Sequence, residues 1–455
     1  MIEAKHSIYY SEVSIEFSDS AIDTLINLAE KSTLVSNAKA YAIYEKSDEW
    51  SMAIGCFAEI IITKAKVTLV LDSYKKVYQE ENLVDAIYQA SQDIPVNNWR
   101  LYGCARYEMS HVFYNFSHYI DDKKILGKLF LPEYEIRIVG KKVLLRSIYP
   151  EKLNILVDIF TQAVCNSTPD SVYSNKMDDD TIARLQYPSQ NNYKLSVKSA
   201  IDEINENHYQ KVIISRKVML PKNIDLLRTY HNGRKHNTPA RSFLVQYNDF
   251  GLAGFSPETL LESDAEGWLS TQPLAGTRAL TKSKEENQRL QAELLNDTKE
   301  LAEHAVSVKL AQEELLSICI NDTVKVSEFM SIRERGSVQH LASRVVGKLC
   351  KDKHIWNAFE TLFPAVTASG IPKKAAIDAI KRHEDCDREW YSGCVFTVDS
   401  DNKMDAALTL RAIYRDNNHY WLQAGAGVVD LSTPERELEE TSEKLECVIQ
   451  SVVEQ

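Results

Sequence analysis

Short stretches of alternating apolar and polar residues occur along this chain, with segments of helical spacing between them. Trp50–Leu71 is rich in β-branched residues, and EYEIRIVGKKVLLRS alternates on both sides of Gly140, which predicts a hairpin. Between Tyr193 and Ile204 the apolar residues recur at helical spacing, and the strand-like segment KVIISRKVML follows directly. The first half therefore predicts strands broken by helices, and the second half begins with a helix and a strand.

The remaining residues continue this mixture. FLVQY and GLAGF flank a polar turn, WLSTQPLAG is strand-like, and a helix is predicted from about Asp297 to Ile318. Three further predicted strands, VFTVDS, AALTLRAIYR and HYWLQAGAGVV, precede a last helix that begins near Pro434. Strands joined by turns, with helices interspersed rather than strictly alternating, predict an α+β fold with large antiparallel sheets.

The chain shows no repeat and no long Pro/Gly/Ser linker, so we expect one domain over residues 1–455. Its 53 Lys and Arg residues against 65 Asp and Glu residues give a net charge of -12. This charge argues against nucleic acid or an anionic membrane as a partner, and a small anion must be held by local cations. The opening MIEAKHSIYYSEVSIEF has no basic start followed by an apolar run, and the eight cysteines form no CxxC pair, so we expect a cytoplasmic protein with reduced thiols.

Two predicted helices each carry a pair of glutamates three residues apart, Glu300 with Glu303 and Glu437 with Glu440. This spacing puts both carboxylates of a pair on one helix face. If the pairs converge, four carboxylates would suit Mg²⁺. The alternative is local, because Glu300 lies three residues after a helix-capping aspartate and Glu440 lies four residues before a lysine.

Three basic residues stand in apolar surroundings. Lys211 and Arg216 lie on opposite faces of one predicted strand, and an inward lysine loses solvation, which favours the neutral amine that a general base needs. The alternative for Lys211 is a strand-edge lysine that discourages aggregation. Arg411, within AALTLRAIYR, suits either bidentate binding of a carboxylate or an internal salt bridge. His340 is either catalytic or structural, and we expect the cluster HNGRKH (residues 231–236) to form a solvated loop.

Two glycine-bearing segments, PLAGTR and AGAGVV, could present backbone N–H groups to a carboxylate. Neither has the GxxxxGK[ST] or GxGxxG pattern of a nucleotide phosphate loop. The alternative for each segment is a tight turn or a β-bulge.

In order along the chain, KVIISR, GFSPETLLE, PLAGTR, ELAEH, HLASRV, FPAVTASGIPK, YSG, LTLRA, AGAGVV and STPERELEETSEK resemble the motifs of the chorismate-binding enzymes. This family includes the anthranilate, aminodeoxychorismate, isochorismate and salicylate synthases. The resemblance is carried by residues 193–455, whereas residues 1–192 are less recognisable. It implies a single-domain fold of two large, mostly antiparallel sheets packed as a sandwich with helices outside, to which the N-terminal part contributes strands.

The resemblance also implies roles for individual residues. Lys211 corresponds to the general base that activates a water for attack on ring carbon 2 of chorismate, and Glu258 to the general acid that helps the carbon 4 hydroxyl leave. The remaining correspondences are the direct Mg²⁺ ligands Glu303 and Glu440, the water-mediated metal shell of Glu300 and Glu437, the enolpyruvyl-carboxylate residues Tyr391 and Arg411, and the pocket around the ring end formed by Gly276, Thr277, Gly425 and Lys444.

Two features separate the members of the family. The members that use ammonia typically carry Gln where this chain has Lys211, so we expect water as the nucleophile and no glutamine amidotransferase subunit. The segments ERGSVQHLASRV and PAVTASGIPK resemble those of salicylate synthases, which convert chorismate through isochorismate to salicylate and pyruvate. His340 and Thr367 are the residues that we associate with the second step.

Two alternatives stay open at this point: an isochorismate synthase that releases its product, and an inactive chorismate-binding protein. Retention of the base, the acid and all four glutamates argues against the inactive protein. The family resemblance implies that the salicylate enters siderophore biosynthesis, and we expect a monomer.

Overall fold

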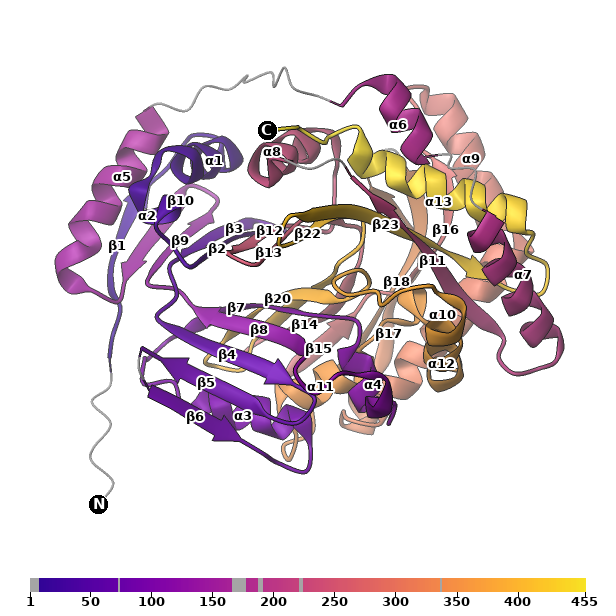
Figure 1. Cartoon of the computed structure of the whole chain (residues 1–455), viewed down its shortest axis with the longest axis horizontal. Helices are drawn as coiled ribbons and strands as arrows, with labels where there is room; N and C mark the ends of the chain where they lie inside the picture. Colours follow the sequence, from indigo (N-terminus) through magenta and orange to yellow (C-terminus); the bar gives the residue numbers. More distant parts are fainter. Residues whose placement is uncertain (1–7, 73, 166–176, 187–190, 221–223, 336–337) are drawn as a thin grey trace.

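The computed structural model describes residues 8–72, 74–165, 177–186, 191–220, 224–335 and 338–455 (Figure 1). The first sheet has the strand order β1 (Ser11–Glu16), β10 (Lys142–Ser147), β9 (Tyr134–Val139), β3 (Glu49–Ile54), β2 (Ala40–Lys46), β12 (Arg241–Tyr247), β13 (Phe250–Ser256), β22 (Ala412–Asp416), β23 (His419–Val428), β11 (Lys211–Met219) and β19 (Gly370–Ile371).

The second sheet has the strand order β16 (Leu274–Ala279), β18 (Val338–Lys348), β15 (Trp268–Thr271), β14 (Thr259–Ser263), β21 (Met404–Leu408), β20 (Cys394–Asp399), β7 (Arg100–Ala105), β8 (Ile125–Leu131), β4 (Ala58–Thr63), β5 (Val67–Leu71) and β6 (Tyr74–Tyr78). A further strand, β17 (Lys325–Arg335), pairs with β18 outside this path. Neighbouring strands in both sheets run antiparallel.

Helices connect and cover the sheets. They are α1 (Ala21–Lys31), α2 (Thr33–Ser36), α3 (Leu83–Gln92), α4 (Met109–Phe113), α5 (Leu153–Cys165), α6 (Asp179–Gln186), α7 (Asn191–Asn205), α8 (Leu226–His236), α9 (Lys284–Asn296), α10 (Thr298–Leu316), α11 (Ile355–Leu362), α12 (Lys373–His383) and α13 (Pro434–Ile449). None of those in the described ranges is both long and apolar enough to cross a membrane.

Buried apolar residues form layers that follow the two sheets. One cluster, with Tyr44, Phe243 and Trp421 among its members, fills the space between the facing strands of the two sheets. Two others lie on the outer face of the first sheet. One is covered by α1, α5, α8 and α13, and the other is covered by α7 and α12. A fourth lies between the second sheet and α3, α10 and α11. Apolar burial on both faces of each sheet stabilises the sandwich, and the prediction of helices outside two antiparallel sheets is confirmed.

The N-terminal part of the chain supplies one half of each sheet. In the first sheet β2 pairs with β12, and in the second β7 pairs with β20, so both sheets are continuous across the boundary between the two parts. The resemblance therefore predicted correctly that the less recognisable residues contribute strands to the same sandwich.

Among the connections that cross from one sheet to the other, β13–β14 and β21–β22 carry Glu258 and Arg411. The chain leaves β13 at Ser256 and enters β14 of the second sheet at Thr259, so Pro257 and Glu258 lie at the crossing. The chain also crosses from β21 of the second sheet to β22 of the first, and Arg411 lies in this connection. AALTLRAIYR is therefore two strands in different sheets, and the prediction of one strand was wrong. The break coincides with a left-handed backbone at Arg411, whose φ of 50° is strained for a residue with a side chain.

The prediction of a solvated loop for HNGRKH was also wrong, because these residues complete helix α8. Asp225 caps this helix by accepting a hydrogen bond from the backbone of Arg228. His231 is 2% exposed, and its Nε2 lies 2.6 Å from Oδ1 of Asp23 on α1. The polar sequence gave no sign of this helix, because the contact of His231 with Asp23 joins residues that are distant in sequence.

Candidate active site

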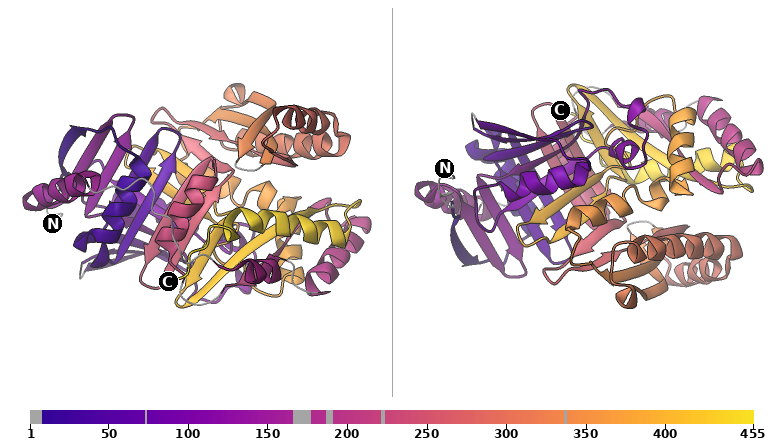
Figure 2. Two further views of the ribbon diagram at one scale, coloured as in Figure 1. Left: turned by 90° about the horizontal axis from the view of Figure 1, so that it is seen from above. Right: turned by 90° about the horizontal axis from the view of Figure 1, so that it is seen from below.

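One pocket collects nearly all the predicted site residues at the end of the sandwich where the chain crosses between the sheets. Twenty residues line it: Lys211, Ile213, Pro257, Glu258, Leu274, Ala275, Gly276, Thr277, Glu303, His340, Thr367, Tyr391, Leu410, Arg411, Gln423, Ala424, Gly425, Gly427, Glu440 and Lys444. Of the predicted site residues, only Glu300 and Glu437 are outside this lining. In Figure 2, α9 and α10 lie on one side of the molecule and the yellow helix α13 on the other, and the pocket takes residues from both α10 and α13.

Strands β11 and β23 form the wall of the pocket that belongs to the first sheet. Their register places Ile213 opposite Gly427, with Lys211 two residues before Ile213 on the same face. Arg216 lies on the other face, where its Nε donates to Thr441 Oγ1 of α13 at 2.7 Å. The prediction that Lys211 and Arg216 face opposite ways is therefore confirmed.

Glycines let neighbouring side chains approach the backbone closely at two places in the wall. Gly425 lies within β23, and a Cβ there would lie 2.8 Å from the hydroxyl oxygen of Tyr391, so AGAGVV forms part of a strand rather than a turn. Gly276 lies at a bulge between β16 and β18 with a φ of 61°, and a Cβ there would lie 3.0 Å from a carboxylate oxygen of Glu300. For PLAGTR, the alternative of a bulge was correct.

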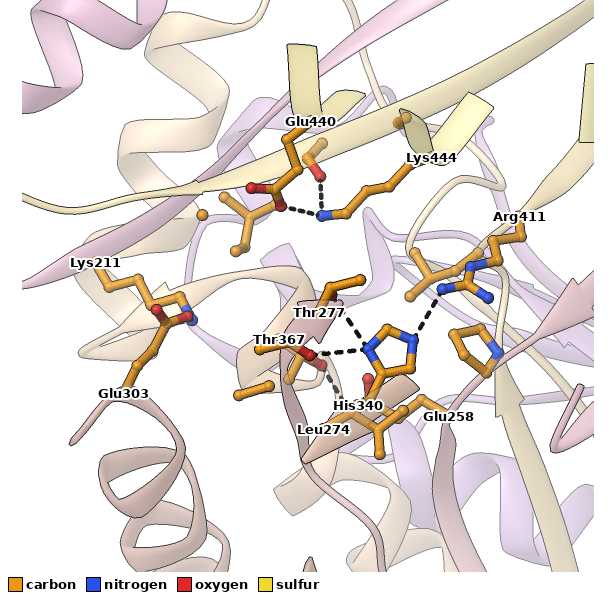
Figure 3. A pocket seen from close by; sticks show the side chains of 18 of the residues that line it. Lys211, Glu258, Leu274, Thr277, Glu303, His340, Thr367, Arg411, Glu440 and Lys444 are labelled. Atoms are coloured by element: carbon orange, nitrogen blue, oxygen red, sulfur yellow. Dashed lines mark hydrogen bonds and ion pairs between the residues drawn. The ribbon is translucent and has the colours of Figure 1, made fainter. Parts of the chain in front are cut away.

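At one end of the pocket, two lysines are paired with the glutamates that were predicted to bind metal. Nζ of Lys211 forms an ion pair with Glu303 of α10 (Figure 3). Nζ of Lys444 lies 2.7 Å from Oε1 of Glu440 and donates to the Gly425 carbonyl at 2.8 Å. Burial alone would raise the pKa of Glu440, but the Lys444 ammonium holds it below its ordinary value.

The other two predicted metal-site glutamates lie behind this end. Burial, followed by the carboxylate of Glu303, raises the pKa of Glu300, which also lies 3.5 Å from Nη1 of Arg278. Glu437 is 4% exposed on α13. Within the described ranges, no three histidine, cysteine or acidic side chains surround one point closely enough to hold a metal ion. Two of the four carboxylates, Glu303 and Glu440, therefore line this end of the pocket, and each is paired with a lysine.

At the other end, Glu258 is buried against an uncharged partner. Its side chain is 5% exposed, and Thr367 Oγ1, from the short 3₁₀ turn Val366–Ala368, donates to its Oε1 at 2.8 Å. Burial raises the pKa of Glu258 to about 8, although the Thr367 hydrogen bond and the Lys211 charge act in the opposite direction. A carboxyl group with this pKa is protonated at neutral pH and can donate a proton.

His340 and Arg411 form a second uncharged contact at this end. Nη2 of Arg411 lies 3.0 Å from Nε2 of His340, and a guanidinium can only donate, so Nε2 accepts and the ring proton is on Nδ1. Nδ1 lies 3.0 Å from the Gly276 carbonyl, which accepts that proton, and 3.2 Å from Thr277 Oγ1 (Figure 3). Burial, followed by the Arg411 charge, lowers the pKa of His340 to about 3, so the ring is neutral.

Arg411 has no carboxylate partner among the residues that the structure describes. Of the two alternatives for this residue, the internal salt bridge is therefore absent there, and the binding of an anion agrees with the geometry. Tyr391 lies in the same lining, and burial raises the pKa of its hydroxyl.

Sequence reasoning missed several lining residues, namely Ile213, Pro257, Leu274, Ala275, Leu410, Gln423, Ala424 and Gly427. Strand alternation could have identified three of them, because Ile213 lies two residues after Lys211, and Gln423 and Gly427 lie two residues on either side of Gly425. Leu410 could not be found in this way, because it lies at the unexpected crossing between β21 and β22.

We compared this chain, with its two-sheet sandwich and its pocket, with known protein families and with known proteins. The family described as chorismate binding enzyme matches residues 37–450, and the chain belongs to it. The expected resemblance is thereby confirmed.

Individual relatives agree. A salicylate synthase of Mycolicibacterium paratuberculosis is 34% identical over 434 residues, which cover 95% of this chain and 93% of the relative. An anthranilate synthase component 1 of Saccharolobus solfataricus is 34% identical over 260 residues, covering 57% of this chain and 62% of that one. Among solved structures, the menaquinone-specific isochorismate synthase of Escherichia coli shares the fold with a TM-score of 0.72 at 20% identity, covering 98% of this chain and 95% of that chain.

Proposed function

We propose that this enzyme is a Mg²⁺-dependent salicylate synthase, which converts chorismate through isochorismate to salicylate and pyruvate. The observation that carries the proposal is the similarity to a salicylate synthase along nearly the whole of both chains. The anthranilate synthase relative of Saccharolobus solfataricus matches only 57% of this chain. Lys211, at the position where ammonia-using members typically have Gln, supports water as the nucleophile and activity without an amidotransferase subunit.

In the first step, two groups on different walls handle the protons. Lys211, on β11 of the first sheet, takes a proton as the neutral amine from the water that attacks ring carbon 2. Glu258, at the crossing into the second sheet, gives its proton to the hydroxyl that leaves carbon 4. One water is added and one is released, so the step is an isomerisation of chorismate to isochorismate.

The four glutamates fit a hard cation by their chemistry. Glu303 and Glu440 line the pocket and would bind Mg²⁺ directly, and Glu300 and Glu437 would hold its water shell. The raised pKa of Glu300, due to burial and to the nearby carboxylates of Glu303, Asp297 and Glu440, reflects negative charge that a cation would relieve. When bound, Mg²⁺ would neutralise the ring carboxylate of the substrate.

In the second step, the enolpyruvyl group leaves as pyruvate after the hydrogen on ring carbon 2 moves to its methylene carbon. We propose that the pocket promotes this step by holding a reactive conformer. Arg411 and Tyr391 hold the enolpyruvyl carboxylate, and the neutral ring of His340 orients the Arg411 guanidinium. Thr367, whose Oγ1 donates to Glu258, lines the same pocket and helps to hold this conformer. We further propose that the salicylate enters siderophore biosynthesis.

Product analysis tests this function. Purified enzyme is incubated with chorismate and Mg²⁺, and the products are separated and identified by mass. We expect salicylate and pyruvate in equal amounts, with isochorismate rising and then falling. Excess EDTA should abolish turnover, and added Mg²⁺ should restore it.

Four outcomes would contradict parts of the proposal. Isochorismate as the end product, without pyruvate, would identify an isochorismate synthase. Chorismate that is bound but unchanged would indicate an inactive binding protein. Undiminished turnover in excess EDTA would exclude the metal role, and anthranilate formed on addition of ammonia would contradict the assignment of water as nucleophile.

A further inference from the structure

The pocket is surrounded by four basic side chains that differ in whether an acidic partner balances them. Lys211 and Lys444 each form an ion pair with a glutamate. Arg411 and Arg335 have no carboxylate within ion-pairing distance in the part of the chain that the structure describes. In a protein with a net charge of -12, two unbalanced guanidinium groups near one pocket require an explanation.

Arg335 lies at the rim of the pocket, as the last residue of strand β17. In the β17–β18 pairing Arg333 is opposite His340 and Arg335 is opposite Val338, so Arg335 is on the same face as His340. Its Nε donates a long hydrogen bond of 3.4 Å to the carbonyl of Pro257, which lines the pocket. The guanidinium is therefore close to the crossing that carries Glu258.

The hydrogen bonds of Arg335 leave donors available. Besides Pro257, it donates only to the backbone carbonyl of Glu334, through Nη1, within the described residues. Burial, followed by the charges of Arg333, Arg241 and Arg411, lowers the pKa of Arg335, although an arginine stays charged at neutral pH. The mutual repulsion of these cations costs stability, and an anion entering the pocket would relieve it.

We propose that Arg335 is a substrate-capturing residue, which attracts the anionic substrate to the Arg411 end of the pocket. This inference deepens the proposed function and rests on it for the two carboxylates of the substrate. The effect acts at long range through charge, so it strengthens binding of the dianion, and it leaves the proton transfers by Lys211 and Glu258 unchanged.

The variant Arg335→Gln tests this role, because it removes the charge and keeps a long polar side chain. At low ionic strength we expect KM for chorismate to rise roughly three- to tenfold, with kcat unchanged. Salt should raise KM of the parent enzyme and shrink the difference, because a partly exposed charge is screened. Arg335→Lys should restore most of the affinity. Arg333→Gln is the matched control, since Arg333 lies on the same strand but is ion-paired with Glu328.

An unchanged KM at low salt would overturn the inference. So would a loss in kcat, because this would mean that Arg335 acts by positioning the backbone at Pro257 instead. Calorimetric binding of chorismate at the same two ionic strengths makes the comparison independent of turnover. Failure of the parent enzyme to form salicylate would count against the proposed function, whereas a salt-independent affinity that is equal in parent and variant would count against Arg335 alone.

Discussion

The two ends of the pocket treat charge in opposite ways. Between α10 and α13, Lys211 and Lys444 balance Glu303 and Glu440, so every charged group that lines this end has an oppositely charged partner. At the crossings between the sheets, Glu258 is neutralised by burial, His340 is a neutral ring, and Arg411 has no acidic partner among the described residues.

This difference indicates how an acidic protein can bind a dianion. At the balanced end, the carboxylates of Glu303 and Glu440 face the pocket. A metal ion bound there would compete with Lys211 and Lys444 for them. At the other end, burial keeps Glu258 and His340 uncharged, so neither group opposes or adds to the field of Arg411. In the proposed function, the substrate places one carboxylate at each end, one toward the glutamates that we propose as Mg²⁺ ligands and one toward Arg411.

The largest effect is expected at the balanced end, for Lys211→Ala. Loss of a general base should reduce formation of isochorismate by roughly 10²- to 10⁴-fold, measured by chromatography of the products. A small primary amine added to the buffer should restore part of the rate, which a purely structural lysine would not allow. Lys217→Ala is the matched control, because Lys217 is on the same strand but lies over the ring of Trp421. A native rate in Lys211→Ala would refute the assignment of the base.

At the other end, the raised pKa of Glu258 predicts a pH dependence of defined sign. The acid must be protonated, so kcat/KM should fall about tenfold per unit as pH rises above about 8. The variant Glu258→Gln should have a low kcat/KM at every pH, without the fall in kcat/KM at alkaline pH. A native profile that stays flat one unit above this pKa would contradict the role of Glu258.

The same group affects stability, and the sign can be checked independently. Its pKa is about 8 in the folded protein against 4.5 in the unfolded chain, so between these values the folded state binds more protons. The contribution of Glu258 to stability is therefore complete below about pH 4.5 and is lost as pH approaches 8, by an amount on the order of a few kcal/mol. Chemical denaturation should show this loss in the parent protein and a smaller one in Glu258→Gln.

The sequence predicted the balanced end less completely than the other. Spacing placed each glutamate pair on one helix face, and Glu303 and Glu440 do line the pocket. It could not reveal the ion pair of Lys211 with Glu303, because these residues are distant in sequence and meet only in the folded chain, where α10 packs on β16 and β18.

For the fold, periodicity predicted many of the strands and the helices α7, α10 and α13, because alternation and helical spacing reflect which face is buried. It failed at AALTLRAIYR, where apolar residues continue while the chain changes sheets, and at HNGRKH, where polar residues form a helix. In both places tertiary contacts, rather than local pattern, determine the structure. Two residues of the segment ERGSVQHLASRV, 336 and 337, lie outside the described residues.

The smallest effect is expected for Thr367→Val, which tests the finer distinction between the two products. Valine keeps the shape of threonine but removes the hydroxyl that donates to Glu258. Since that hydrogen bond lowers the pKa of Glu258, its loss should move the alkaline limb of kcat/KM upward by a fraction of a unit. If Thr367 also serves the second step, isochorismate should accumulate a few-fold more relative to salicylate, because differences of only ~1 kcal/mol between transition states change a product ratio severalfold.

Thr361→Val is the control, since Thr361 donates only to the carbonyl of Asn357 on its own helix. A shifted limb with an unchanged product ratio would restrict Thr367 to the first step, and no change in either would leave Glu258 positioned by its buried surroundings alone.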